Sequence, residues 1–227
     1  MKNIGLLVAV ELDAVTKKYK DKIIRDHVKG FDVYKVKTED YNLYFVHTKE
    51  GEIRAAGGAQ MLFDTYDIDL LINFGVVGGL REDLEVEDIC FVDKVVHYDM
   101  DISAIDKIEK GRYAQYPDIY LRTNKAIMDK VKEMYEDIPV FTCASGDKFI
   151  DSREAKLSLA KEFGADICDM EAAAVVLISD LNQKPNLIIK IVSDSLTGGA
   201  GEYEEKSGKA ADMCINIVEQ ILKEEII

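Results

Sequence analysis

Short apolar runs that alternate with amphipathic segments are the feature that most limits the fold of this sequence. Residues 4–10 are apolar throughout, and residues 70–74 and 187–192 are interrupted only by Asn73 and Lys190, without the alternation of a half-exposed strand. Strands of this kind lie inside a sheet that is covered on both faces. Residues 52–66 and 171–181, in contrast, have helical spacing. We therefore predict an α/β fold: a three-layer domain with a central, mostly parallel, mixed and twisted sheet flanked by helices.

The remaining segments fit the same scheme. Further strands are predicted over residues 31–37, 43–47, 89–96, 140–143 and 165–169. Further helices are predicted over residues 12–24, 124–135, 153–163 and 201–225. The polar residues 99–116 are predicted to form a loop. A chain of 227 residues without a linker or repeat suits one core, so residues 1–227 are predicted to form a single domain.

Charge and composition exclude several classes of partner. The chain has 29 Lys and Arg against 43 Asp and Glu, a formal net charge of −14. Such a surface repels polyanions, so neither nucleic acid nor an acidic membrane is an expected partner. No apolar run reaches membrane-spanning length, and residues 1–10 are too short for a signal peptide. The four cysteines form no Cys-x-x-Cys pair and are predicted to be buried thiols in a cytoplasmic protein.

Acidic residues follow three of the predicted strands. Folds of this class bind ligands outside the carboxyl ends of their strands. Glu11 and Asp13 follow the first strand, and Glu171 and Asp194 follow two later ones. Their convergence at one edge would make an acid/base site. Each acid is equally suited to cap a helix, and the glycines at 75–79 to make a tight turn, so the residues alone indicate only an α/β enzyme.

The sequence contains no cofactor motif. It has neither a dinucleotide-binding fingerprint nor a phosphate-binding P-loop. Its three histidines, His27, His47 and His97, do not have the spacing of metal ligands. We therefore expect no cofactor and no metal, and a small molecule as the partner.

Taken in order, several segments resemble the purine nucleoside phosphorylase/uridine phosphorylase superfamily, in particular its 5′-methylthioadenosine/S-adenosylhomocysteine nucleosidase branch. The similar segments span nearly the whole chain: residues 4–9, 73–80, 97–104, 144–150, 169–172 and 193–194. The resemblance implies hydrolysis of the N-glycosidic bond of a purine nucleoside, with release of adenine. It also implies a place in purine metabolism and methionine salvage, and a homodimer in which each subunit contributes to its partner's site.

The resemblance assigns roles at the reacting centre. Asp194 matches the aspartate that protonates purine N7, which makes the base a better leaving group. Ser193 matches the serine that orients this acid. Glu171 matches the glutamate that binds the ribose hydroxyls, and Met170 the residue that packs under the sugar.

Further matched residues would line the base and the 5′ substituent. Phe149 matches the aromatic residue that stacks on the base, and Ile150 the residue whose backbone reads the adenine edge. Ile102 and Ile105 match apolar positions of the base and alkylthio pockets. Tyr203 falls where the family has an aromatic lid residue at the start of the last helix.

The sequence departs from the family near the sugar. The family's water-activating glutamate aligns by spacing with Asp13, which is one methylene shorter, and Glu11 is the alternative base. Val76, close to Gly78 in the glycine segment, replaces a serine beside the sugar. Lys190 stands where an arginine is usual, which loses a planar, bidentate donor.

Charge favours water over phosphate as the attacking group. Glu11 and Asp13 would repel a phosphate dianion, and Asn73 and Val76 stand where hexameric phosphorylases carry an arginine and a serine. We therefore favour hydrolysis. Phosphorolysis, with Arg54 as a phosphate contact, is one alternative. A catalytically weak nucleoside-binding homologue, suggested by the altered positions 13 and 76, is the other.

Overall fold

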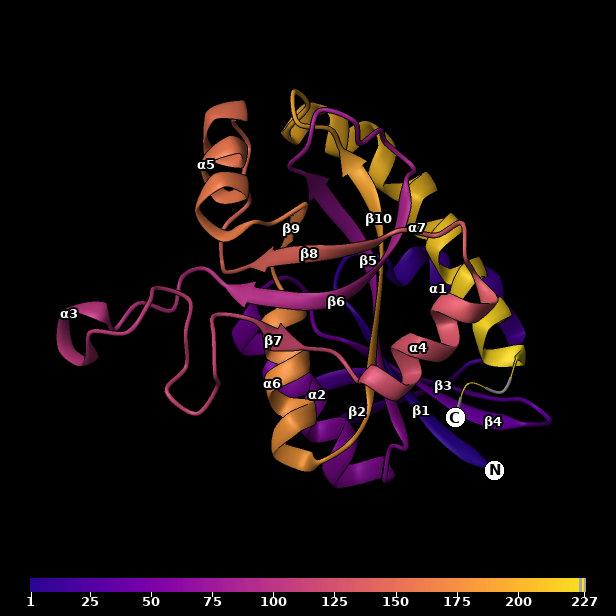
Figure 1. The fold of residues 1–227 in the computed structure, drawn as a ribbon. Helices are drawn as coiled ribbons and strands as arrows, with labels where there is room; N and C mark the ends of the chain where they lie inside the picture. Colours follow the sequence, from indigo (N-terminus) through magenta and orange to yellow (C-terminus); the bar gives the residue numbers. More distant parts are fainter. Residues whose placement is uncertain (225, 227) are drawn as a thin grey trace.

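The computed structural model describes residues 1–224 and residue 226, which form a sheet covered by helices (Figure 1). The strands are β1 (Lys2–Val8), β2 (Ile24–Val28), β3 (Phe31–Lys37), β4 (Tyr41–His47), β5 (Leu70–Gly79), β6 (Ile89–His97), β7 (Leu121–Arg122), β8 (Val140–Ser145), β9 (Ile167–Asp169) and β10 (Asn186–Asp194). The helices are α1 (Leu12–Tyr19), α2 (Glu52–Tyr66), α3 (Ser103–Asp106), α4 (Lys125–Met134), α5 (Arg153–Phe163), α6 (Ala172–Asn182) and α7 (Ala200–Lys223), with a 3₁₀ turn at Lys20–Lys22.

Five strands of the sheet close into a ring. The strand order is β10-β6-β8-β9-β5-β1-β4-β3-β2, and β10 also pairs with β5. Strands β5, β9, β8, β6 and β10 thus have neighbours on both sides, while β1, β4, β3 and β2 extend from β5 as an open sheet. All nine residues of β10 are buried. The ring fixes the positions of the strand ends at which the site lies.

The predicted fold class is confirmed, with a more evenly mixed sheet than the sequence indicated. Pairings β1–β4, β1–β5, β5–β10, β6–β8 and β8–β9 are parallel. Pairings β2–β3, β3–β4, β5–β9, β6–β7 and β6–β10 are antiparallel. Strands β2, β3 and β4 are joined by short turns, which permit only antiparallel neighbours.

Helices cover the two faces of the sheet and bury separate parts of the core. Helices α1, α4 and α7 pack on one face, where Val15, Val131 and Ile215 are fully or nearly fully buried. Helices α2 and α6 pack on the other, with Leu62 and Val176 in the core (Figure 1). Helix α5 encloses a third, smaller cluster. The three predicted layers are present.

Two segments differ from the sequence prediction for physical reasons. The helix predicted over 12–24 ends at Tyr19, and residues 24–28 form the edge strand β2. The side chains of this strand are exposed or half-buried, so no apolar period marks it. The glycines at 75–79 continue strand β5 rather than forming a turn, because β10 and β9 pair with them.

Other predictions hold with small shifts of boundary. The segment 99–116 contains only the one-turn helix α3. The last helix runs from Ala200 to Lys223, and residue 225 of the predicted range lies outside the described residues. All four cysteines are free and buried, as predicted. No helix in the described part of the chain has the length and apolar character that crossing a membrane requires.

Candidate active site

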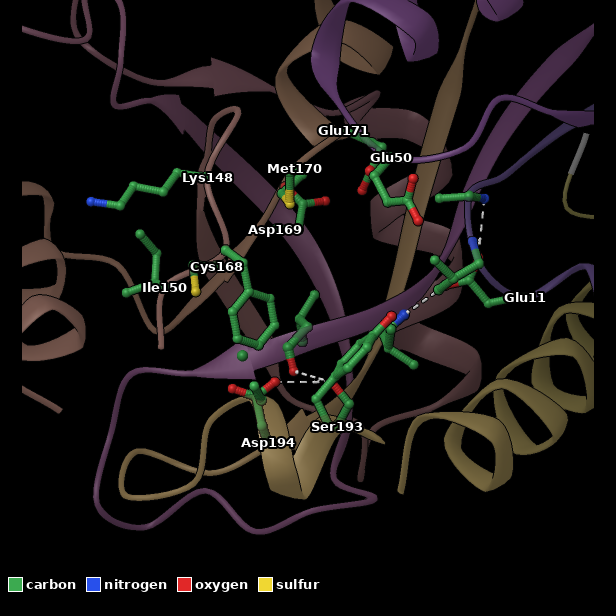
Figure 2. A pocket seen from close by; sticks show the side chains of 18 of the residues that line it. Glu11, Glu50, Lys148, Ile150, Cys168, Asp169, Met170, Glu171, Ser193 and Asp194 are labelled. Atoms are coloured by element: carbon green, nitrogen blue, oxygen red, sulfur yellow. Dashed lines mark hydrogen bonds between the residues drawn. The ribbon is translucent and has the colours of Figure 1, made fainter. Parts of the chain in front are cut away.

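A cavity of about 420 Å³ lies where several strands of the sheet end, beneath the first turn of α7 (Figure 2). It collects most of the residues predicted for the site. Those that line it are Glu11, Val76, Gly78, Phe149, Ile150, Met170, Glu171, Ser193, Asp194 and Tyr203. Three predicted residues do not line it: Asp13, Ile102 and Ile105.

Asp194 occupies one end of the cavity, at the end of β10. The register between β10 and β5 shifts at Ser193, and such a bulge redirects the side chain that follows it. Asp194 Oδ2 accepts a hydrogen bond from Lys156 Nζ at 2.5 Å, and Oδ1 accepts one from Ser193 Oγ at 3.0 Å. Gly78 leaves room for this carboxylate, since a Cβ there would lie 3.2 Å from Oδ2.

Burial raises the pKa of Asp194 above its ordinary value, while the hydrogen bonds from Lys156 and Ser193 oppose that rise. An aspartate shifted in this direction holds a proton more readily than a surface one. It is also buried, with 1% of its surface exposed. This is the property that a general acid at the end of a cavity needs.

Lys156 was missed by the sequence analysis, although helix α5 carries a signal for it. Lys156 lies on the buried stripe of α5 with Leu159 and Phe163, and its side chain is fully buried. A lysine at such a position requires a carboxylate partner in the interior. Its ammonium also donates to the carbonyl oxygen of Ser195 at 2.6 Å, which fixes the chain just after Asp194.

Glu11 provides a second buried carboxylate, held by backbone amides. Its Oε2 accepts hydrogen bonds from the amides of Ala9 at 3.1 Å and Val10 at 3.0 Å. Its Oε1 accepts one from the amide of Val76 at 3.1 Å. Gly75 makes this possible, because a Cβ at position 75 would lie 2.4 Å from Oε1. The glycine segment therefore gives space to both Glu11 and Asp194.

The prediction that placed Asp13 at the site is wrong. Asp13 lies in the exposed first turn of α1, outside the cavity. The alignment by spacing failed because β1 ends at Val8, and the chain turns back at residues 9–11 before the helix begins. That turn directs the side chain of Glu11, rather than that of Asp13, into the cavity.

Glu171 lies across the cavity from Asp194, next to Met170 (Figure 2). Its Oε1 accepts a hydrogen bond from the amide of Gly51 at 3.0 Å. Burial and the nearby charge of Asp169 raise the pKa of Glu171 to about 8. At neutral pH this carboxyl group therefore holds a proton and can both donate to and accept from hydroxyl groups.

A buried polar network lies behind Glu171. Lys190 Nζ lies 2.7 Å from Asp169 Oδ2, and both side chains are 1% exposed. Ser145 Oγ lies 2.5 Å from both Asp169 Oδ1 and Glu52 Oε1. The serine has only one hydroxyl proton, so the second short contact requires a proton on a carboxyl group. Burial raises the pKa of Glu52 to about 7, so Glu52 is the group that holds it.

The same network keeps Asp169 ionised. Although burial favours its protonated form, the charge of Lys190 and its hydrogen bond hold the pKa of Asp169 below its ordinary value. The amide of Ala172 and the hydroxyl of Ser145 add further hydrogen bonds to the carboxylate. Lys190 stands out in the sequence only as a departure from the family, and the other members of the network, Glu52, Ser145 and Asp169, were not predicted.

Two aromatic rings cover the cavity near Asp194. The rings of Phe149 and Tyr203 meet edge to face, with centroids 5.5 Å apart. Tyr203 comes from α7, and Phe149 from the loop after β8. Phe149 is 39% exposed, and Ile150 beside it is buried. A planar ring could stack on Phe149 in this position.

Ile102 and Ile105 do not line the cavity of their own chain. Ile105 is 80% exposed on α3, which stands away from the rest of the fold (Figure 1). Their assignment to the base and alkylthio pockets stays a prediction. Helix α3 extends outward instead of folding back over the cavity of its own chain (Figure 1).

Arg54, the candidate phosphate contact, also lies elsewhere. Its Nε donates to the carbonyl oxygen of Thr48, and its guanidinium lies over the ring of Phe31, 5.5 Å from the centroid. It does not line the cavity. In the described residues, no group of three or more His, Cys, Asp or Glu side chains is arranged to hold a metal ion.

Three charged residues at the cavity, all exposed, were not predicted: Glu50, Lys148 and Glu204. Glu50 lies in the loop after β4, and the amide of the next residue, Gly51, donates a hydrogen bond to Glu171. No sequence pattern distinguished these residues from other surface charges. Only their position around the cavity makes them candidates for contact with a ligand.

The chain belongs to the phosphorylase superfamily, whose family model matches residues 3–223. It is 30% identical over 209 residues to a 5′-methylthioadenosine/S-adenosylhomocysteine nucleosidase of Maridesulfovibrio salexigens, covering 83% of this chain and 90% of that protein. It is 27% identical over 176 residues to an aminodeoxyfutalosine nucleosidase of Campylobacter jejuni, covering 76% of this chain and 74% of that protein.

The fold also matches a solved structure. The futalosine hydrolase of Helicobacter pylori superposes with a TM-score of 0.91 at 21% identity, covering 98% of each chain. This likeness confirms the fold alone. The resemblance that the sequence motifs indicated is confirmed by the family model and by the named relatives.

Proposed function

We propose that this chain is a purine nucleosidase that hydrolyses an N-glycosidic bond and releases adenine. The first candidate substrates are 5′-methylthioadenosine and S-adenosylhomocysteine, because a relative at 30% identity is named for them. Aminodeoxyfutalosine is a further candidate, because another relative is named for it. The observation that carries the proposal is a single cavity with two buried carboxylates of different character, Asp194 and Glu11.

In this proposal Asp194 is the general acid. A purine stacked on Phe149 would present N7 to Asp194, whose raised pKa favours the protonated form. Proton transfer to N7 neutralises the departing base as the bond to the anomeric carbon breaks. Ser193 and Lys156 hold the carboxyl group in one orientation. Lys156 is a positioning residue, since its ammonium already binds Asp194 and Ser195.

Glu11 is the proposed base. Three backbone amides donate to its two oxygens, so the orientation of its carboxylate is fixed. A negative charge next to the sugar stabilises an oxocarbenium-like centre, and the carboxylate accepts a proton from the water that attacks it. Glu171, opposite, would bind the ribose hydroxyls. This arrangement supports water over phosphate, and the position of Arg54 gives phosphorolysis no support.

A homodimer belongs to the same proposal. The exposed side chain of Ile105 and the outward position of α3 suit a segment that reaches a second copy of the chain. Ile102 and Ile105 would then line the partner's cavity. A cytoplasmic location and a role in methionine salvage remain predictions that accompany this function.

Base release from 5′-methylthioadenosine, measured by chromatography with and without phosphate, tests the reaction. We expect adenine and free methylthioribose in phosphate-free buffer. Turnover that depends on phosphate, with a sugar 1-phosphate as product, would make the chain a phosphorylase. Tight nucleoside binding without release of any base would make it the silent homologue.

A matched pair of variants tests the base. We expect Glu11→Gln to lower kcat by about 10²-fold or more, the range of a lost general base. Asp13→Asn removes an equal charge two residues away, outside the cavity, and should leave kcat within about twofold. Equal losses in the two variants would contradict the assignment of Glu11.

A further inference from the structure

The cavity carries an uneven distribution of charge. Six of the residues that line it in the described chain are acidic, and Lys148 is the one basic residue among them. Asp194 and Asp169 are each paired with a buried lysine, and Glu11 accepts hydrogen bonds from backbone amides. The charge that remains without such compensation lies at the exposed edge of the cavity.

Glu50 is the acidic residue at this edge that adjoins Glu171, the proposed ribose-binding residue. The next residue, Gly51, donates its amide to Glu171 Oε1 at 3.0 Å, so Glu50 lies beside Glu171. Figure 2 shows these two side chains together, at the opposite end of the cavity from Asp194. Within residues 1–224 and 226, the structure records neither a hydrogen bond nor an ion pair for the Glu50 carboxylate.

In the proposed pose, this position would correspond to the 5′ end of the nucleoside. With the base at Asp194 and the ribose hydroxyls at Glu171, the 5′ carbon would lie on the side of the sugar away from the base. A group attached to it would extend past Glu171 toward the opening beside Glu50. Lys148 lies on another side of the cavity, away from Glu50 and Glu171 (Figure 2).

We propose that Glu50 selects purine nucleosides whose 5′ substituent carries a positively charged group, such as an amine. This inference rests on the proposed function and adds the substrate class. An ammonium at the opening gains an attractive interaction with the Glu50 carboxylate, whereas a carboxylate there meets repulsion from Glu50 and from the overall charge of −14. A neutral methylthio group is neither attracted nor repelled by these charges.

The test compares three adenosines that differ only at the end of the 5′ substituent: 5′-aminoethylthio-, 5′-methylthio- and 5′-carboxyethylthio-adenosine. The readout is the ratio of kcat/KM values for adenine release. We expect the amine to be preferred over the carboxylate by about tenfold, since each exposed charge contributes a factor of up to about five. Glu50→Gln should reduce this preference about threefold to fivefold, and raising the salt concentration to about 0.5 M should reduce it in the native chain.

The matched control is Glu39→Gln, which makes the same charge change in the turn before β4, at the opposite end of that strand from Glu50. It should leave the preference unaltered. An unchanged preference in Glu50→Gln, or a preference for the carboxylate in the native chain, would overturn the inference. So would a change carried by Glu204→Gln in place of Glu50→Gln. If none of the three nucleosides loses adenine, the proposed function fails and the inference fails with it.

Discussion

The interior holds two lysine–carboxylate pairs that differ in what surrounds the carboxylate. Lys156 pairs with Asp194 at 2.5 Å, and Lys190 pairs with Asp169 at 2.7 Å. Asp169 also receives hydrogen bonds from Ser145 and the amide of Ala172, and its pKa lies below the ordinary value. Asp194 receives one further bond, from Ser193, and its pKa is raised.

The difference shows that a buried lysine alone does not decide the charge of its partner. Both carboxylates are desolvated, and desolvation favours the protonated form. At Asp169 the charge and hydrogen bond of Lys190, together with the donors Ser145 and Ala172, overcome this effect. At Asp194 the hydrogen bonds from Lys156 and Ser193 oppose it without overcoming it. We infer that the Lys190–Asp169 pair is structural, with a fixed charge, and that Asp194 of the Lys156–Asp194 pair can exchange a proton with a ligand. Three predictions test this contrast.

The largest expected effect is on catalysis. Asp194→Asn should lower kcat for adenine release by about 10²–10⁴-fold, because the amide cannot supply a proton to the base. Its oxygen can still accept from Lys156, so nucleoside binding should persist in calorimetric titration. Full turnover in this variant would remove Asp194 from the reaction.

The second prediction concerns stability at the other pair. Asp169→Asn leaves the charge of Lys190 without its buried partner and should lower the free energy of unfolding by about 3–5 kcal/mol, measured by urea denaturation. The control is Asp212→Asn, which removes the exposed partner of Lys17 and should cost about 1 kcal/mol or less. Similar losses in both variants would show that the Lys190 pair has no special role.

The smallest expected effect is a pH dependence of stability. In the folded chain the pKa values of Glu171 and Glu52 are raised from 4.5 to about 8 and about 7. At a pH between the ordinary and the raised values, the native state therefore binds more protons than the unfolded chain. Stability from these groups is therefore greatest at low pH and is lost as pH rises through about 7 and 8.

The melting temperature should fall by several degrees between about pH 6.5 and pH 8.5, since 1 kcal/mol corresponds to about 2–4 °C in a chain of this size. Glu52→Gln keeps a hydrogen-bond donor near Ser145 but cannot titrate, and should make the decline shallower. A melting temperature that rises over this range, or a Gln variant as steep as the native chain, would contradict the proton assignment.

The parts of the fold that the sequence predicted are those with an apolar period. Strands buried on both faces and helices with one apolar side were located to within a few residues. Strand β2 was missed because its residues are exposed or half-buried and its stability comes from pairing with β3. The closure of the ring depends on pairings between strands distant in the sequence, which local patterns do not encode.

Site residues were predicted correctly where they lie in segments that resemble the family, and were missed or misplaced elsewhere. Asp194, Glu171 and Phe149 come from segments with clear family resemblance, and they line the cavity. Asp13 was predicted from its spacing along the sequence, and spacing does not reveal the turn that directs Glu11 inward. Lys156 was missed because its partner lies 38 residues away, and a lysine in a helix is ordinarily a surface residue.

The closed ring of strands has a consequence for how such a protein can change over generations. Asp194 ends strand β10, which pairs with β5 as far as Asp194 itself and with β6 as far as Ile191. The edge of the cavity, with Glu50 and Lys148, is made of loops that carry no such pairing. Substitutions there leave the reacting end in place. A few substitutions at the edge of the cavity can thus change the nucleoside specificity during evolution, while the residues around Asp194 stay the same.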